Sequence, residues 1–278
     1  DFVFSSPQRG FAVGQLDRRN GSTQPSVLLT HDGGRHWTTK RVKDTPFSIF
    51  PLDDSRLFMV GDNALWYSAE GGVDWEKRKL PKVRGGRQML RCHFLDEKHG
   101  WVFGEGKIFF VTTDGGLSWS AVPESSALNL KDEHTTLTWG TFTSPNNGVI
   151  IGHAAAPKRD GPRFPDWMMP ERATRANLQP SSTVFLQTAD QGKTWSASLA
   201  SMFGTAVRLR SHGIRALVIY DYGDGFQVPS EVYEFDLRTG YSSAAFRQQN
   251  LSVSDAMPIS GGGVLLACIE SAGKLRNS

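Results

Sequence analysis

Acidic side chains that could serve hydrolysis occur in segments rich in glycine and polar residues. In glycoside hydrolysis one carboxyl group protonates the leaving oxygen, and a second acts as base or nucleophile. The catalytic candidates in this sequence are Asp17, Glu133, Asp221 and Asp224. The last two belong to the stretch Tyr-Asp-Tyr-Gly-Asp-Gly, for which a simple turn is about four times as common an explanation as a catalytic pair. A second couple, Glu133 with His134, is adjacent in sequence, and neighbouring loop residues seldom face each other.

Basic side chains form a pattern better suited to binding. Residues 77–91 contain seven lysines and arginines and no acidic residue, and residues 154–181 add more arginines beside a tryptophan and two methionines. Guanidinium groups interleaved with such side chains suit an acidic peptide, a carboxylated sugar or a phosphate. The predicted binding residues are Arg84, Arg87, Arg159, Arg163, Trp167 and Arg172. A solvated charged surface is the alternative, with roughly even odds.

One eight-residue pattern, found four times, indicates which elements must position these groups. The copies are THDGGRHW (30–37), SAEGGVDW (68–75), TTDGGLSW (112–119) and TADQGKTW (188–195), and their tryptophans are 38, 44 and 76 residues apart. In each copy the carboxylate can accept backbone N–H groups, and glycine supplies the positive φ of a tight reversal. The tryptophan then opens the next strand and presents an apolar face to a neighbouring sheet. Each copy therefore predicts a hairpin turn.

A repeat near 40 residues with four short strands per unit predicts a β-propeller blade. The chain is thus expected to be all-β, with four-stranded antiparallel blades and a single domain over 1–278. The expected blades are about 1–42, 43–82, 83–124, 125–200, 201–248 and a partial one at 249–278, with an insertion at 154–181 in the fourth. About five and a half blades are visible, so we expect a parent propeller of six or seven that is incomplete at its C-terminus, because a propeller must close to hide its edges.

The blade pattern sorts the loops onto two faces. The four repeated turns join the third and fourth strands of a blade, whereas the long loops join the second to the third strand, or one blade to the next. These long loops are 15–25, 80–89, 123–136, 154–181 and 221–229. Long loops gathered on one face of a rigid scaffold are the usual place for binding or catalysis.

The repeated pattern, Ser/Thr-x-Asp-x-Gly-x-Ser/Thr-Trp, resembles the Asp-box, or bacterial neuraminidase repeat. In that family the box is structural, which implies structural roles for Asp32, Trp37, Glu70, Trp75, Asp114, Trp119, Asp190 and Trp195. Glu70 departs from the pattern by replacing Asp, and His36 and Asp74 replace the usual hydroxyl. The family includes sialidases, xyloglucan-cleaving glycosidases, sortilin-type receptors and photosystem II assembly factors.

Two members of that family bear on function. The units GFAVG (10–14) and GWVFG (100–104), each followed by a box, look like the photosystem II assembly factors, which are non-enzymatic scaffolds that bind a polypeptide through an arginine-lined surface. The insertion at 154–181 departs from their compact blades. The sialidases' Arg-Ile-Pro type of motif is absent, and Pro162-Arg163-Phe164-Pro165 is only a scrambled version of it. The segment 14–19 corresponds in position to a sialidase's first active-site loop, with Asp17 as the acid/base candidate.

Net charge, apolar runs and the spacing of cysteines and histidines argue against several other classes of protein. The net charge of +3 is too small to argue for nucleic acid, and no apolar run approaches the roughly 20 residues of a membrane span. Cys92 and Cys268 are expected to be buried free thiols, and the seven histidines show no metal-ligand spacing. No cofactor motif is found.

The sequence therefore predicts a non-catalytic binding or assembly propeller. We expect a monomer that lies outside the cytoplasm, periplasmic or secreted, and that recognises a protein or an acidic or carbohydrate ligand through its basic loop face. The alternative is a diverged glycoside hydrolase of the sialidase superfamily.

Overall fold

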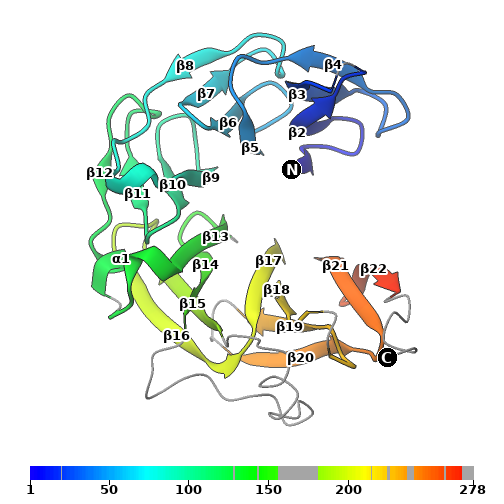
Figure 1. Ribbon diagram of the computed structural model, residues 1–278. Helices are drawn as coiled ribbons and strands as arrows, with labels where there is room; N and C mark the ends of the chain where they lie inside the picture. Colours follow the sequence, from blue (N-terminus) through cyan, green and yellow to red (C-terminus); the bar gives the residue numbers. More distant parts are fainter. Residues whose placement is uncertain are drawn as a thin grey trace. The chain divides into compact units, whose positions relative to one another are not determined.

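The computed structural model describes the chain except at residues 20, 128, 143, 156–180, 214, 224–225, 237–240, 260 and 271–278. Within the described residues it contains five four-stranded antiparallel sheets and one two-stranded sheet (Figure 1). The chain divides into two compact units, Asp1–Val122 and Pro123–Ser278. The prediction of an all-β protein built from four-stranded antiparallel blades is confirmed, whereas a single propeller domain over 1–278, incomplete at its C-terminus, stays a prediction.

The first unit contains three sheets, each formed by consecutive strands. The first sheet comprises β1 (Phe2–Phe4), β2 (Gly10–Asp17), β3 (Thr23–Thr30) and β4 (Thr38–Arg41). The second comprises β5 (Pro46–Pro51), β6 (Leu57–Gly61), β7 (Leu65–Ser68) and β8 (Glu76–Arg78). The third comprises β9 (Met89–Phe94), β10 (Gly100–Gly104), β11 (Phe109–Thr112) and β12 (Ser120–Ala121), and a short 3-10 helix η1 (Arg84–Gly86) precedes it.

The second unit contains two further four-stranded sheets and the pair. The fourth sheet comprises β13 (Thr135–Phe142), β14 (Gly148–Ala155), β15 (Ser181–Thr188) and β16 (Ser196–Phe203). The fifth comprises β17 (Thr205–His212), β18 (Arg215–Asp221), β19 (Ser230–Asp236) and β20 (Ser242–Arg247), and β21 (Leu251–Pro258) pairs with β22 (Val264–Glu270). Two short helices, α1 (Glu124–Ala127) and η2 (Asp132–His134), precede β13.

Each repeated turn joins the third and fourth strands of its sheet, as predicted, and in three of the four a hydroxyl and a carboxylate close the turn. In the third sheet the Thr112 hydroxyl donates to Asp114 Oδ1 at 2.8 Å and accepts the Gly116 N–H at 2.8 Å. Asp114 also accepts the N–H groups of Leu117 (3.0 Å) and Ser118 (2.9 Å) and the Ser118 hydroxyl (2.6 Å). Hydrogen bonds from Ser118, then from the other donors, lower the pKa of Asp114 to about 2.

The second turn shows what the substitution by glutamate costs. Asp32 and Asp190 repeat the Asp114 arrangement, with His36 and Thr194 as the late donors. In the second turn Ser68 still accepts the Gly72 N–H at 2.9 Å. Among the described residues, however, no hydrogen bond reaches the Glu70 carboxylate. The longer side chain therefore leaves this turn with only half of the network.

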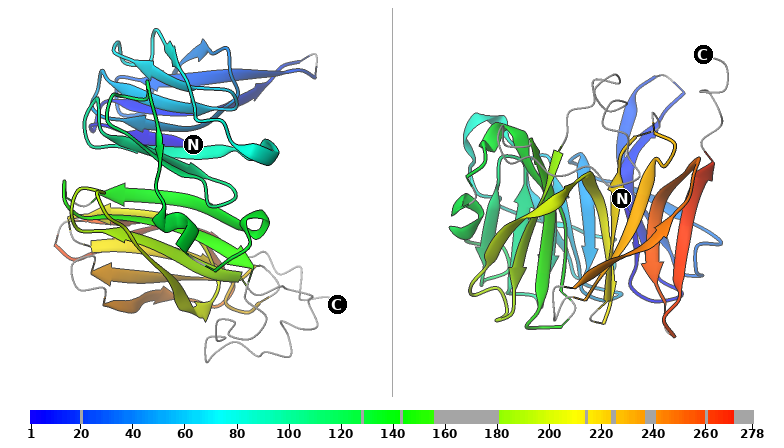
Figure 2. Two further views of the ribbon diagram at one scale, coloured as in Figure 1. Left: turned by 90° about the vertical axis from the view of Figure 1, so that its left-hand side faces the viewer. Right: turned by 90° about the horizontal axis from the view of Figure 1, so that it is seen from below.

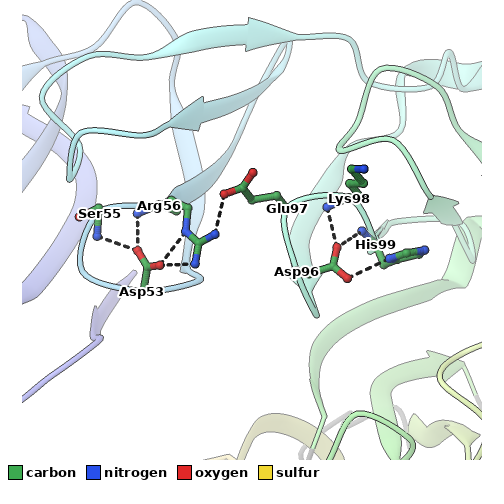
Figure 3. Close-up of polar contacts among 7 residues, drawn as sticks. All are labelled: Asp53, Ser55, Arg56, Asp96, Glu97, Lys98 and His99. Atoms are coloured by element: carbon green, nitrogen blue, oxygen red, sulfur yellow. Dashed lines mark hydrogen bonds and ion pairs between the residues drawn. The ribbon is translucent and has the colours of Figure 1, made fainter.

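The turns between first and second strands lie against the repeated turns. Ser55 O accepts the Gly71 N–H at 2.7 Å, and Lys98 O accepts the Gly115 N–H at 2.9 Å. Figure 3 shows two such turns: Asp53 accepts the N–H groups of Ser55 and Arg56, and Asp96 accepts those of Lys98 and His99. Arg56 then reaches Glu97 at 2.5 Å and links the second sheet to the third. Asp53 and Asp96 are thus used by their own turns, whereas Glu97 pairs with the turn of the neighbouring sheet.

Apolar side chains fill the space between successive sheets within each unit. In the first unit Phe58 lies flat on Phe94 of the next sheet, with ring centroids 3.5 Å apart, and Trp75 and Trp119 pack onto the inter-sheet clusters. In the second unit Phe185 contacts Phe235 of the next sheet, with ring centroids 5.4 Å apart. The predicted role of the box tryptophans in packing between sheets holds for Trp75 and Trp119.

Glycine opens several second strands because an aromatic ring covers that position. A Cβ added at Gly100 would lie 2.3 Å from the ring of Phe94, the last residue of the preceding strand. The pairs Gly10 with Phe4 and Gly148 with Phe142 repeat this arrangement. The first glycine of the G-(F/W)-x-x-G units is therefore fixed by packing.

Three predictions about loops and thiols are corrected. The expected loop 15–25 is mostly a hairpin, since Gln15 pairs with Pro25 and Asp17 with Thr23, and this hairpin reaches beyond the second sheet (Figure 2). The expected loop 123–136 contains the two short helices. Cys92 is buried, as expected, but Cys268 is exposed on β22, which among the described residues pairs with β21 alone.

Candidate functional site

A β-bulge recurs in the first strand of the second to sixth sheets. One residue of that strand has no partner on the second strand, and the register shifts there by one. Bulges bend a strand and redirect a side chain, and they are frequent near functional sites. The residues that resume pairing after the bulge are Ser48, Arg91, Trp139, Arg208 and Asp255. Three of these equivalent positions, all in the second unit, are brought together.

These three residues and Arg210 form what we call the inner arginine cluster: Trp139, Arg208, Arg210 and Asp255. In the second unit β17 lies between β13 and β21 (Figure 1), so its arginines reach both neighbours. The guanidinium carbons of Arg208 and Arg210 lie 4.7 and 5.1 Å from the ring centroid of Trp139. Cation–π attraction of this kind holds arginines in place without using their hydrogen-bond donors.

Asp255 approaches the two arginines from the other side. Its carboxylate accepts from Arg210 Nε at 3.2 Å and Nη2 at 2.9 Å, a bidentate pair. Arg208 Nη1 is farther away, 3.5 Å from Asp255 Oδ2. Partial burial raises the pKa of Asp255, but the hydrogen bonds and charge of Arg210, with the charge of Arg208, outweigh it and leave the pKa below its usual value. Two cations therefore share one anion.

The equivalent positions of the first unit form a different arrangement. Arg91 Nη1 lies 2.8 Å from Asp1 Oδ2, and the N–H of Ile49 donates to the same oxygen at 3.4 Å. Two residues after Arg91 on the same strand, the His93 ring contacts Phe50 in a tilted arrangement with centroids 4.6 Å apart, and burial lowers the pKa of His93 to about 3. This region pairs one arginine with one aspartate.

The predicted catalytic carboxylates are not brought together among the described residues. Asp17 is exposed at the end of β2, and Glu133 is exposed in η2. Asp221 ends β18 and accepts the N–H of Gly223 at 2.9 Å, which is ordinary turn chemistry. Asp224 lies outside the described residues.

A tyrosine–glutamate pair does occur, but inside a sheet. The Tyr222 hydroxyl donates to Glu231 Oε2 at 2.9 Å, and Arg247 Nη1 lies 3.3 Å from Glu231 Oε1. Glu231, on β19, is fully buried, and Tyr222, which directly follows β18, is nearly so. Burial, then the Glu231 charge, raises the pKa of Tyr222 above its usual value, which opposes a nucleophilic role.

The predicted binding residues are only partly described. Arg84 lies in η1, and Arg87 follows it, with its side chain packed over Gly106. Arg159, Arg163, Trp167 and Arg172 lie outside the described residues. The pairing of β14 with β15 ends with Ala155 and Ser181, at the end of the sheet opposite to the repeated turn at 188–195.

The sequence alone did not identify the inner arginine cluster. Its members come from three strands and lie 45 to 116 residues from one another between strands, and each looks like an ordinary strand residue. Aligning the first strands of the repeats would have placed Trp139, Arg208 and Asp255 at one position. In the described part of the chain, no group of three or more His, Cys, Asp or Glu residues could hold a metal ion, and no helix is long and apolar enough to cross a membrane.

Residues 41–135 match the family described as Photosynthesis system II assembly factor YCF48. Over these residues the chain is similar to the YCF48 assembly factors. It is 25% identical over 199 residues to the photosystem II stability/assembly factor HCF136, chloroplastic, of Arabidopsis thaliana, covering 64% of this chain. That alignment covers 47% of HCF136, so the chain spans about half the length of this relative.

Solved structures support the fold of this YCF48-like chain. The structure described as YCF48 bound to D1 peptide matches 99% of this chain and 78% of that chain, with a TM-score of 0.58 and 16% identity. A GH74 xyloglucanase from Xanthomonas campestris matches 92% of this chain and 39% of that chain, with the same TM-score and 11% identity. Fold similarity therefore does not separate a binding protein from a glycosidase, and the sequence matches are what point to the assembly factors.

Proposed function

We propose that this chain is a non-catalytic binding or assembly scaffold that recognises an acidic segment of a protein partner. The observation that carries the proposal is the inner arginine cluster, in which two guanidinium groups are held on one tryptophan and share one carboxylate. Such a surface attracts carboxylates in bidentate geometry. It has no second carboxylate among its members and so lacks the pair that glycoside hydrolysis needs.

The relatives support the same class of function. HCF136 is a stability/assembly factor by name, and a YCF48 structure contains a D1 peptide. A polypeptide partner for this chain extends that likeness. Arg84 and Arg87, in the first unit, remain proposed binding residues in their own right, and a carbohydrate ligand remains the alternative to a peptide. The proposed setting is a monomer outside the cytoplasm, as the resemblance to Asp-box propellers implies.

A fluorescently labelled peptide of ten glutamates separated by glycines tests the proposal. We expect the chain to bind it more tightly than a matched glutamine peptide, with an affinity that falls as salt rises. The double change Arg208→Gln and Arg210→Gln should weaken binding at least about tenfold, because the charges that fix the carboxylates are lost. Fluorescence anisotropy measures all of these affinities.

The matched control is Arg35→Gln with Arg41→Gln, which removes two exposed arginines of the first sheet and the same net charge. This control should change the affinity by less than about twofold, the scale of a rim charge. The parallel change Arg84→Gln with Arg87→Gln tests the loop contribution. Equal binding of the two peptides, or equal loss in the control and the Arg208/Arg210 variant, would contradict the proposed function.

A further inference from the structure

The inner arginine cluster holds an internal carboxylate in the place that suits an external one. Asp255 presents both oxygens to the Nε and Nη2 edge of Arg210, the fork that would bind a ligand carboxylate. Asp255 comes from β21 and the arginines come from β17, so the contact joins two sheets of the second unit. An acidic ligand must therefore compete with Asp255 for the same donors.

The cluster is open enough for such an exchange. The side chains of Arg208, Arg210 and Asp255 are 28%, 23% and 24% exposed. Rotation of the Asp255 side chain would break the contact with Arg210 without moving a strand, although Asp255 Oδ1 also accepts the N–H of Ala256 at 2.9 Å. The carboxylate is thus held by three hydrogen bonds and one longer ion pair, in a cluster that is partly exposed.

Arg208 has the weaker contact with Asp255, and this favours its binding to an incoming carboxylate. In the described part of the chain its one ion pair is the 3.5 Å approach to Asp255, whereas Arg210 is engaged bidentately. Trp139 fixes both guanidinium groups, so they stay in place when the carboxylate moves. An incoming carboxylate would meet two positioned cations and one displaceable anion.

We propose that Asp255 is an autoinhibitory stand-in for a ligand carboxylate, and that an acidic side chain of the partner takes its place on Arg208 and Arg210. This inference rests on the proposed function, because it concerns the same cluster. It adds that the affinity of the free protein for acidic segments is held down by its own aspartate.

The glutamate peptide tests this with Asp255→Asn, which keeps the shape of the side chain and removes its charge. We expect a three- to fivefold gain in affinity, about the scale of a partly exposed ion pair. Glu270→Gln, an exposed acidic residue of β22, is the control with the same change in net charge and should leave the affinity unchanged. The gain should persist at 0.5 M salt, because contacts within about 4 Å are screened less than long-range repulsion.

The outcomes separate the two proposals. If the wild type does not prefer the glutamate peptide, or if losing both arginines has no more effect than the control pair, the proposed function is wrong. If the arginines matter but Asp255→Asn leaves the affinity unchanged or lower, with an unaltered unfolding temperature, the competition by Asp255 is wrong. A gain shared by Glu270→Gln, or one that disappears at 0.5 M salt, also overturns it, because general repulsion would then explain the effect.

Discussion

The carboxylates of the repeated turns and the carboxylate of Asp255 are used in opposite ways. Asp114 accepts its hydrogen bonds from the hydroxyl and N–H groups of its own turn, all within four residues. Asp255 instead faces two arginines from another strand. The turns are complete without any ligand, whereas the inner arginine cluster has more positive than negative charge. The difference separates the part that maintains the fold from the part suited to recognition.

The largest effect that separates the two regions should come from a buried hydroxyl. Thr112→Val removes the donor to Asp114 and the acceptor of the Gly116 N–H, and leaves a buried N–H without its partner. We expect a loss of about 2 kcal/mol in the free energy of unfolding, measured with urea.

The matched control is Thr141→Val, near the inner arginine cluster, where the hydroxyl contacts only the Ser211 hydroxyl at 2.9 Å among the described residues. It should cost less than about 1 kcal/mol. Equal losses in the two variants would remove the distinction between a closed turn network and the cluster region.

A smaller effect should come from completing the second turn. The double change Glu70→Asp and Asp74→Ser restores the residues that accept and donate in the third turn. We expect about 1 kcal/mol of added stability, because the shortened carboxylate can accept N–H groups that Glu70 does not. Asp74→Ser alone is the control and should give no gain. A destabilised double variant would show that the second turn has a geometry of its own.

The smallest effect should be a pH dependence of the complete turns. The pKa of Asp114 and that of Asp190 are about 2 in the folded protein, below the value of about 4 in an unfolded chain. A lowered folded pKa stabilises above pH 4, and this contribution is lost as the pH falls toward 2. The unfolding temperature of the wild type should therefore exceed that of Asp114→Asn by a few degrees at pH 6, and the gap should narrow toward pH 2. A difference in unfolding temperature that stayed constant between pH 6 and pH 2 would show that the lowered pKa of Asp114 does not cause it.

Much of the fold could be predicted because its signals are local. Hydroxyl, carboxylate, glycine and tryptophan within eight residues determine each turn, and the alternation beside it determines the strands. The hairpin of β2 and β3 was missed because Pro25 normally argues against a strand. The β3–β4 ladder ends at Ser26, and beyond it the Pro25 carbonyl still accepts the Val42 N–H at 3.1 Å, so Pro25 stands at the end of this ladder, where a proline is tolerated.

The candidate site could not be predicted because its contacts are between sheets. No residue near Trp139 in the sequence indicates that it contacts Arg208. Likewise, no residue near Arg210 indicates that it pairs with Asp255. Their proximity depends on the bulges, each produced by one extra residue in a first strand. The long loops that the sequence favoured as a binding surface contain many charged residues, but charge alone does not determine which side chains contact each other.

The recurring bulge gives this protein a short signature that can be read in other chains. In each sheet from the second to the sixth, one residue resumes pairing after the bulge, and these five residues are Ser, Arg, Trp, Arg and Asp. Relatives that keep the repeated turns but have other residues at these five positions should share the fold and differ in the ligand that they bind. Sorting homologous sequences by the residues at these five positions would group them by ligand preference before any of their structures is known.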